Sequence, residues 1–306
     1  MRSIVTGGNG FIGSHIVDKL VELGHDVIVI DDLSATCNEQ FYFKKNGNVR
    51  NYKMSISCEH IERRFEDVDY VFHLAAESRI QPALKNPELA IQTNVLGTAK
   101  VLEYARKYGV KRVMYSSTSA AYGLSNSIPL QEDMKKDCLN PYSITKTAGE
   151  DFCRMYHDLY GLETVIFRYF NVYGERQPTK GQYGPVIGLF QRQISEGESM
   201  TVVGDGLQTR DYTHVSDVVN ANITAMLSDN KDISGEIFNV GTGRRYSIMD
   251  LVKMIGGESA SFTHLPPRLG EARDTQADIT KIKTMMDWEP QVKLEDWLLK
   301  YGENLC

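Results

Sequence analysis

The chain has 306 residues, a formal net charge of -6 at pH 7 and 42% hydrophobic residues. Because this length exceeds the size at which one core usually keeps growing, we expect one large and one smaller lobe. The negative charge argues against nucleic-acid binding, and no stretch reaches the roughly 20 apolar residues of a membrane span. The N-terminus enters a strand-like run rather than a signal peptide, so we expect a cytoplasmic protein that binds no membrane.

A glycine-rich turn follows the first apolar run, Ser3-Ile4-Val5, and precedes residues with helical spacing. Gly8, Gly10 and Gly13 fit G-x-G-x-x-G, whereas Gly7, Gly10 and Gly13 fit the looser G-x-x-G-x-x-G. Glycines at these places permit a tight turn, close approach of the backbone to phosphates, and close packing of helix on strand. The strand, turn and helix therefore predict a site for a dinucleotide pyrophosphate at the carboxyl edge of a parallel sheet.

The next predicted strand, Val27-Ile28-Val29-Ile30, ends in Asp31 and Asp32. An acidic residue at this distance from the glycines binds a ribose 2′-hydroxyl, and its charge repels the 2′-phosphate of NADP. No Arg or Lys occurs in residues 31–36 to accommodate that phosphate. The sequence therefore favours NAD as the cofactor. The alternative is that both aspartates are solvated residues at a strand end.

Apolar strands alternate with helical patterns through the first half of the chain. Further strands are predicted at 70–73, 112–115 and 164–167, and long helices at about 87–108 and 141–160. This alternation is typical of an α/β fold with a doubly wound parallel sheet. After Asn171 the pattern breaks into loops and short helices, and we expect a smaller C-terminal α/β lobe there, covering a substrate.

A Tyr-x-x-x-Lys pair, Tyr142 and Lys146, lies at the start of the predicted helix 141–160, with Asn140 as its N-cap. A hydroxyl-rich run, 116–123, ends the preceding predicted strand. The lysine ammonium, the helix N-terminus and a nicotinamide cation would stabilise the tyrosine phenolate, and a pKa lowered by about three units needs about 4 kcal/mol. Because 16 tyrosines make a chance match easy, the alternative is an ordinary surface pair.

Taken together, these motifs resemble those of the extended short-chain dehydrogenase/reductases, in particular the NAD-dependent epimerase/dehydratase group and its UDP-hexose 4-epimerases. The resemblance covers nearly the whole chain. It is carried by Thr6 to Gly13, Val71 to Ala76, Gln92 to Thr98, Ser116 to Gly123, Tyr142 to Lys146, Arg168 to Gly174, Gly204 to Gly206, Thr209 to Tyr212, and Arg268 to Arg273.

The resemblance implies a Rossmann domain over residues 1–170 and a nucleotide-sugar lobe over 171–306, with about 212–240 returning to the Rossmann domain. It makes Tyr142 the catalytic acid and base and Lys146 its partner at the nicotinamide ribose. Thr118 binds the reacting oxygen, with Ser117 and Ser119 as competitors for that role. The implied NAD residues are Gly7, Gly10, Phe11, Ile12, Gly13, Asp31, Asp32, Ser55, Ile56, Leu74, Ala75, Ala76, Asn94, Tyr142, Lys146 and Phe170. The implied substrate residues are Ser78, Thr118, Tyr142, Asn171, Arg210, Arg268 and Thr275.

The residues after Thr118 separate the reactions within this family. Sugar 4,6-dehydratases carry Asp-Glu there, and UDP-glucuronate decarboxylases keep the Glu, whereas this chain has Ser119 and Ala120. The resemblance then implies an isomerase that epimerises C4 of a UDP-hexose through a 4-keto sugar, with NAD recycled. Alternatives are a UDP-glucuronate 4-epimerase, a dehydratase or reductase, a net oxidoreductase, and a non-catalytic NAD sensor.

Substrate choice is read from Thr275, the seventh residue after Arg268. Epimerases strict for UDP-glucose and UDP-galactose carry a bulky Tyr there, near the sugar C2 substituent. The small Thr275 implies that UDP-N-acetylglucosamine and UDP-N-acetylgalactosamine are accepted, alone or beside the glucose pair. The chain departs from the family at Met54-Ser55-Ile56, where Gly-Asp-Ile is common. Ser55 can bind adenine, but weaker retention of NAD is expected.

The resemblance also implies a homodimer, in which helices 87–108 and 141–160 pair with their symmetry mates in a four-helix bundle. Apolar surface for this pairing would come from Leu96, Tyr104, Met155 and Tyr156, although the sequence leaves a monomer open. The five cysteines are odd in number and include no C-x-x-C pair, so reduced thiols are expected. No metal is expected, because the spacings of His73, His214 and His264 match no site.

Overall fold

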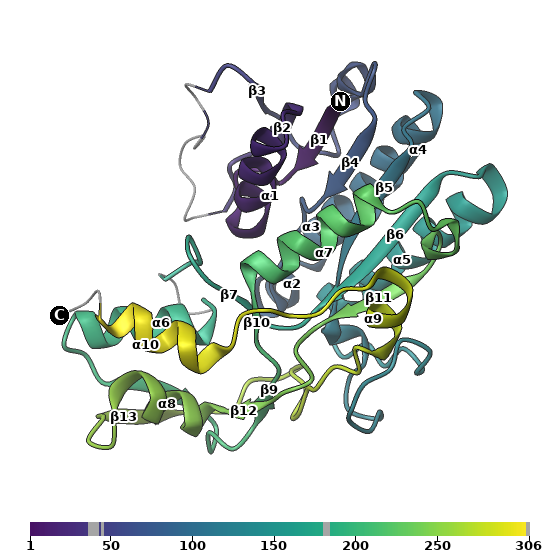
Figure 1. The fold of residues 1–306 in the computed structure, drawn as a ribbon. Coiled ribbons are helices and arrows are strands. Elements are labelled where there is room, and N and C mark those ends of the chain that lie inside the picture. Colours follow the sequence, from purple (N-terminus) through teal and green to yellow (C-terminus); the bar gives the residue numbers. More distant parts are fainter. Residues whose placement is uncertain (36–42, 44–45, 180–183, 304–306) are drawn as a thin grey trace.

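The computed structural model describes residues 1–35, 43, 46–179 and 184–303. Its centre is a seven-stranded parallel sheet in the order β11-β6-β5-β4-β1-β2-β3, with helices on both faces (Figure 1). The predicted doubly wound α/β fold is therefore confirmed. The strands are β1 (Arg2–Thr6), β2 (Asp26–Asp31), β3 (Val49–Lys53), β4 (Tyr70–His73), β5 (Arg112–Thr118), β6 (Glu163–Tyr169) and β11 (Ile237–Val240).

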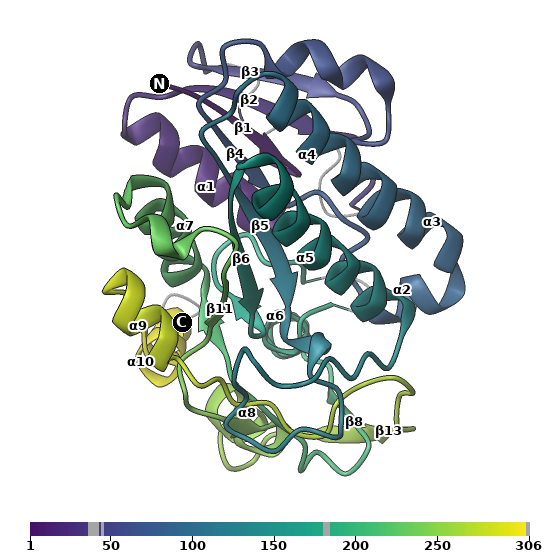
Figure 2. The same cartoon turned by 90° about the vertical axis from the view of Figure 1, so that its right-hand side faces the viewer.

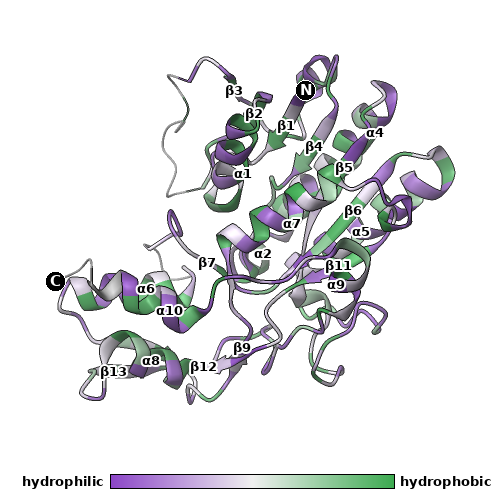
Figure 3. Cartoon of the chain, viewed as in Figure 1, coloured by the Kyte–Doolittle hydropathy of each residue, from purple (hydrophilic) through white to green (hydrophobic). Residues whose placement is uncertain are grey.

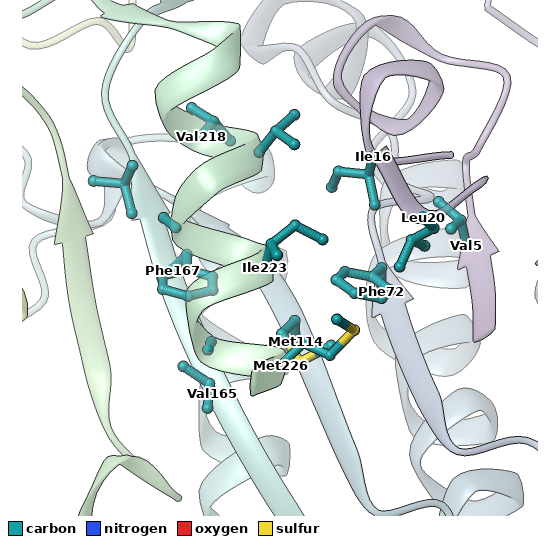
Figure 4. Close-up of a cluster of buried hydrophobic side chains, with 14 of the residues drawn as sticks. Val5, Ile16, Leu20, Phe72, Met114, Val165, Phe167, Val218, Ile223 and Met226 are labelled. Atoms are coloured by element: carbon teal, nitrogen blue, oxygen red, sulfur yellow. The ribbon is translucent and has the colours of Figure 1, made fainter. Parts of the chain in front are cut away.

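One face of the sheet is covered by α1 (Phe11–Glu22), α7 (Val215–Leu227) and α9 (Thr280–Met286). The close-up in Figure 4 shows side chains of α1 and α7 meeting Phe72, Met114 and Phe167 of the central strands. Segments about 200 residues apart along the chain thus share one apolar core. Strand β11 also arrives late in the chain and pairs with β6 at one edge of the sheet.

The opposite face is covered by α4 (Thr98–Lys107) and α5 (Pro141–Tyr160), and α2 (Ile80–Lys85) and α3 (Pro87–Ile91) pack against α5. Figure 2 shows these helices from the side. The predicted helix at 87–108 is not one regular α-helix, because a π-helical segment, Gln92–Gly97, separates α3 from α4. Gly97 lies so close to Ile56 that an added Cβ would come within 2.6 Å of its Cδ1. Apolar spacing carries no signal for this widened turn.

Helix α5 has the bounds that its sequence predicts, and its ends explain why. Asn140 and Ser143 form a capping box at the N-terminus, with Pro141 in the first helical position. At the C-terminus Gly161 takes a left-handed conformation with φ of 70°. The helix is therefore held at both ends by local chemistry as well as by its buried face.

A smaller lobe follows β6 and has its own apolar core, built around Phe190, Met200 and Leu251. Strands β8 (Met200–Val203) and β13 (Phe262–Leu265) pair in parallel, and short ladders join β7 (Val172–Tyr173) to β10 (Thr213–His214) and β9 (Thr209–Arg210) to β12 (Tyr246–Ser247). Its helices are α6 (Val186–Ser195), α8 (Ile248–Gly256) and α10 (Leu294–Glu303). Figure 3 shows the hydrophobic residues concentrated along the strands of the large sheet. Within the described ranges no helix is long and apolar enough to cross a membrane.

Candidate active site

A cavity of about 830 Å³ is lined both by the carboxyl edge of the parallel sheet and by the smaller lobe. All of the predicted site residues except Asn94 and Phe170 line it. These residues are Gly7, Gly10, Phe11, Ile12, Gly13, Asp31, Asp32, Ser55, Ile56, Leu74, Ala75, Ala76, Ser78, Thr118, Tyr142, Lys146, Asn171, Arg210, Arg268 and Thr275. Residues from distant parts of the chain therefore meet at one place.

Asn94 and Phe170 lie behind the cavity wall. Asn94 is buried in the π-helical segment, where its amide bonds both backbone groups of Glu77 and donates to the Thr145 hydroxyl at 2.9 Å. Phe170 is fully buried in a small apolar cluster with Tyr122. Both residues thus support the wall from behind.

The glycine turn forms a cradle that side chains would fill. Gly7 has a φ of 67°, and a Cβ on it would lie 2.7 Å from the backbone nitrogen of Ala75. A Cβ on Gly13 would lie 2.1 Å from the carbonyl oxygen of Gly7. Gly10 caps the N-terminus of α1, so the positive end of that helix faces the cavity. This geometry fits the pyrophosphate of a dinucleotide.

Asp31 and Asp32 lie beside this cradle at the end of β2. Asp31 accepts hydrogen bonds from the backbone nitrogens of Asn9 at 2.9 Å and Leu33 at 2.8 Å, which fixes the glycine turn against β2. Burial raises the pKa of the Asp31 carboxyl. Asp32 accepts from the backbone of Ser34 at 3.0 Å. Each carboxylate keeps acceptor sites for a ribose hydroxyl, because an ionised carboxylate can accept about four hydrogen bonds.

Tyr142 and Thr118 come from neighbouring elements and share a hydrogen bond. Thr118 ends β5, where its hydroxyl also accepts from the backbone nitrogen of Ala120 at 3.1 Å. Burial raises the pKa of Tyr142, and the hydrogen bond with Thr118 opposes that rise. Among the groups of the chain itself, desolvation of the phenolate therefore outweighs their stabilisation of it, and the expected lowering of this pKa also counts the nicotinamide cation.

Lys146 is buried one turn after Tyr142, with Nζ 4.4 Å from the ring centroid of Tyr115. Burial lowers the pKa of Lys146 to about 8, while the neighbouring Cys153 and Glu150 act to raise it. Burial lowers the pKa of His73 to about 3, and the positive charge of Lys146 adds to this lowering. A pKa of about 8 means that the Lys146 ammonium loses its proton only slightly above neutral pH.

Below Lys146, Glu150 forms a fully buried ion pair with Arg168. One carboxylate oxygen accepts from Nε and the other from Nη2 of Arg168, each at 2.8 Å. The Ser117 hydroxyl donates to the same carboxylate at 2.5 Å, and the guanidinium lies 4.6 Å from the ring centroid of Tyr122. This network links α5, β5 and β6 directly beneath Tyr142, Lys146 and Thr118.

Two arginines mark the other end of the cavity, in the smaller lobe. Arg210 donates to the backbone oxygens of Thr209 at 3.0 Å and Arg273 at 2.9 Å. Glu271 lies between the two arginines, 3.9 Å from Arg210 and 3.8 Å from Arg268. The group carries a net positive charge and its ion pairs are longer than hydrogen bonds, so it can receive an anionic ligand.

Asn171 and Thr275 lie between this end and Tyr142. Asn171 has a φ of 25° and donates to the backbone oxygen of Asp211 at 2.9 Å. The Thr275 hydroxyl is 3.5 Å from the Asn171 amide and accepts from the backbone nitrogen of Asp211 at 3.4 Å. Burial raises the pKa of the Asp211 carboxyl, which holds the backbone of Thr242 and neighbouring residues. Thr275 is thus fixed as a small side chain in the wall.

Several lining residues were missed from the sequence, among them Glu77, Arg79, Gln81 and Glu271. The charged residues of 77–79 directly follow the end of β4, and that position at a strand's carboxyl end was the available signal. No cluster of metal-binding side chains occurs in the part of the chain that the structure describes. His73 instead hydrogen-bonds the hydroxyls of Thr6 and Thr98 at 2.7 Å and 2.9 Å.

Three solved structures are similar to this one over nearly its whole length. The UDP-glucose 4-epimerase of Thermotoga maritima, with UDP-glucose, has a TM-score of 0.91 and 39% identity and covers 99% of each chain. The UDP-N-acetylglucosamine 4-epimerase of Methanobrevibacter ruminantium, in complex with UDP-N-acetylmuramic acid, has a TM-score of 0.91 and 32% identity and covers 100% of this chain and 99% of its own. The UDP-glucuronic acid 4-epimerase of Bacillus cereus, with UDP-glucuronic acid and NAD, has a TM-score of 0.91 and 32% identity and covers 100% of each chain.

The family model for NAD dependent epimerases and dehydratases matches residues 3–241, which include the glycine cradle, Tyr142, Lys146 and both arms of the buried ion pair. The matched segment also contains Arg210, whereas Arg268 and Thr275 lie beyond it. The resemblance inferred from the motifs is thereby confirmed: this chain belongs to the NAD-dependent epimerase/dehydratase family.

Proposed function

We propose that the protein interconverts the C4 epimers of a UDP-hexose, with NAD as its cofactor. The observation that supports this most is the shared cavity, which joins a dinucleotide cradle, the Thr118–Tyr142 hydrogen bond and the arginines of the smaller lobe. Gly7 and Gly13 leave room for the pyrophosphate of NAD, and Asp31 and Asp32 offer acceptors to its ribose. Bound NAD supplies the acceptor that takes the C4 hydride and returns it, and in its oxidised form adds a positive charge.

Tyr142 exchanges the proton of the sugar 4-hydroxyl in this proposal. Thr118 holds the same oxygen, because its hydroxyl already contacts the tyrosine. Lys146 holds the cofactor ribose and keeps a positive charge below the reacting atoms. Arg210 and Arg268 hold the diphosphate, so the hexose can turn over while the nucleotide stays bound. A return of the hydride to the other face completes the epimerisation without net oxidation.

The lining of the cavity supports epimerisation over elimination. Ser119 and Ala120 line it at the two places where 4,6-dehydratases resemble one another in carrying Asp and Glu. A serine hydroxyl is a poor acid or base at neutral pH, and alanine can move no proton. Removal of water across C5 and C6 therefore lacks its acid and base at these positions.

We further propose that the C2 pocket accepts an N-acetyl group. Thr275 is 5% exposed and lines the cavity beside Asn171. A side chain of this size leaves space that a tyrosine would fill. UDP-N-acetylglucosamine and UDP-N-acetylgalactosamine are therefore proposed as substrates, alone or beside UDP-glucose and UDP-galactose.

The first test follows UDP-N-acetylglucosamine by proton NMR without added reductant. We expect signals of UDP-N-acetylgalactosamine and no net reduction of NAD. Tyr142→Phe lacks the hydroxyl that exchanges the proton, so its kcat should fall by at least about 1,000-fold while NAD stays bound. Full activity in Tyr142→Phe contradicts the assignment of the base, and a 4-keto-6-deoxy product contradicts epimerisation.

The second test replaces Thr275 with the bulky residue of the stricter epimerases. In Thr275→Tyr we expect kcat/KM for UDP-N-acetylglucosamine to fall by at least about tenfold, because the phenol ring occupies the space of the N-acetyl group. UDP-glucose, which has no such group, is the internal control and should keep its rate. An equal loss on both sugars, measured in parallel assays, shows that Thr275 does not set C2 specificity.

A third test uses pH. The Lys146 ammonium is present below about pH 8 and lost above it, because burial lowers its pKa. Glu150 opposes this loss, so Glu150→Gln should lower that pKa further and move the alkaline decline of kcat/KM down by about one unit. Asp151→Asn, which changes the exposed neighbour on the same helix, is the matched control. An unchanged decline in Glu150→Gln that still retains NAD rules out the electrostatic role of Glu150.

We also propose a homodimer, in which α3, the following π-helical segment, α4 and α5 pair with their symmetry mates in a four-helix bundle. Leu89, Ile91 and Leu96 are exposed on one side of this pairing face, and Ile144 and Leu159 on the other. Burial of such a face between copies stabilises a dimer through the hydrophobic effect. Sedimentation equilibrium should give a mass twice the 34.5 kDa of one chain. The Leu96→Glu variant should give the mass of a single chain. A monomeric wild-type protein at micromolar concentration refutes the proposal.

A further inference from the structure

Four basic side chains line the cavity, and one of them differs from the rest. Lys146 lies beside Glu150, and Arg210 and Arg268 face Glu271. Arg79 is partly buried, yet its guanidinium makes no ion pair or hydrogen bond with any residue in the ranges that the structure describes. It is thus a partly buried cation at a ligand site, and no carboxylate of the described residues pairs with it.

The backbone at Arg79 is fixed from both sides. Glu77, two residues earlier, is held by Asn94 through bonds of 2.8 Å and 3.0 Å. Asn94 in turn binds Thr145 in the first turns of α5. Arg79 is also the N-cap residue of α2, whose first residues lie against the smaller lobe. Its position is therefore set by the helix that carries Tyr142.

Contacts around α2 place the residues that follow Arg79 beside the start of α5. Gln81 donates to the backbone oxygen of Leu269 at 3.2 Å. A Cβ on Gly270 would lie 3.4 Å from Cβ of Asn140 and 3.8 Å from Cγ2 of Ile80. The segment after Arg79 is thus packed between the N-cap of α5 and the 269–270 turn. Since Tyr142 lies two residues after Asn140 and marks C4 of the hexose in the proposed function, the segment of Arg79 borders the part of the cavity that would receive the sugar.

The charges around this place favour an anion. The acidic residues that line the cavity are Asp31, Asp32, Glu77 and Glu271. Asp31 and Asp32 belong to the cradle, burial and the like charge of Asp32 raise the pKa of the Glu77 carboxyl, and Glu271 lies between the two other arginines. None of them forms an ion pair with Arg79. A guanidinium presents two parallel N–H groups that match a carboxylate, so a carboxylate on the ligand would satisfy it best.

We propose that Arg79 recognises a carboxylate carried by the hexose, which makes acidic UDP-sugars preferred over their neutral counterparts. This inference rests on the proposed 4-epimerase function and names the substrate class of that same site. The carboxylate can belong to C6, as in a uronate, or to an acidic ether on C3, since C3 is bonded to C4 and C6 is attached to C5, the other ring neighbour of C4. The recognition chemistry is the same in both cases. Thr275 governs the C2 substituent independently.

The test compares two matched pairs of substrates that differ in the carboxylate: UDP-glucuronate with UDP-glucose, and UDP-N-acetylmuramate with UDP-N-acetylglucosamine. We expect kcat/KM for the acidic member of one pair to exceed that of its neutral partner by about tenfold or more, as one charge-assisted hydrogen-bonded pair supplies. Arg79→Ala should abolish this preference and leave the neutral sugars within about threefold. Arg79→Lys, which keeps a point charge, should retain part of it.

Arg63→Ala is the matched control, because Arg63 is exposed, lies outside the cavity lining and carries the same charge. It should leave the preference unchanged, so a general effect of net charge is separated from recognition by Arg79. The pair that loses its preference in Arg79→Ala identifies the position of the carboxylate. Equal rates on acidic and neutral sugars in the wild type overturn the proposal. An equal loss on all four sugars in Arg79→Ala also overturns it, because that pattern indicates a diphosphate or structural role.

Dissociation constants measured in the Tyr142→Phe background keep this test independent of turnover. That variant cannot interconvert the ligands, so Kd for the four UDP-sugars can be compared directly by calorimetry. Absence of turnover on every sugar in the wild type counts against the proposed function alone. Tighter binding of an acidic sugar that is lost in Arg79→Ala still supports recognition of a carboxylate, and equal binding refutes it.

Discussion

The buried pair of Glu150 and Arg168 is the constraint on which the rest of the site depends. Removing two charges from water is strongly unfavourable, and the pair is tolerated only because each partner satisfies the other at two points. Its geometry leaves little freedom, since a shift of α5 by one residue along β6 would leave both charges unpaired. Ser117 joins the same carboxylate. The register of Tyr142 and Lys146 on α5 relative to Thr118 on β5 is therefore fixed from below.

The cavity above this pair has two kinds of wall, one at the sheet and one at the smaller lobe. At the sheet the walls are backbone, because Gly7 and Gly13 approach neighbouring carbonyl and amide atoms too closely for any side chain. At the smaller lobe the walls are long charged side chains, with Glu271 between two arginines. The end at the sheet thus selects a ligand by its shape, and the end in the smaller lobe selects it by its charge. A ligand that spans both must place its reacting part near Tyr142.

Much of the fold was predictable because its signals are local. The strand at Tyr70–His73 and the helix at Pro141–Tyr160 were predicted with their observed bounds, the latter from an Asn-Pro start. The π-helical segment and β11 were not predicted as such. The first depends on close packing of Gly97 against Ile56, and the second on pairing with β6 far earlier in the chain. Neither contact leaves a periodic trace in the sequence.

The residues of the candidate site also divide into those that local sequence motifs predicted and those that were missed. Glycine spacing and the Tyr-x-x-x-Lys pair could be read directly, because each motif has one physical purpose. Arg79 and Glu271 were missed, since an isolated charged residue in a loop is most often solvated, and for Arg79 the only signal was its position after the end of β4. For Tyr142 the sequence names the partners of the phenol but not how deeply the phenol is buried, and that burial raises its pKa.

The late arrival of α7 and β11 has a consequence for how the chain is made. The apolar face of α1, with Ile16, Val17 and Leu20, is covered by a helix that begins at residue 215. At about 5–20 residues per second, roughly 10 to 45 seconds pass between synthesis of α1 and synthesis of its cover. The glycine turn is thus synthesised well before α7, and the helix that follows this turn is covered only once α7 has formed. Throughout that interval, the nascent chain exposes the surface that later becomes its largest core.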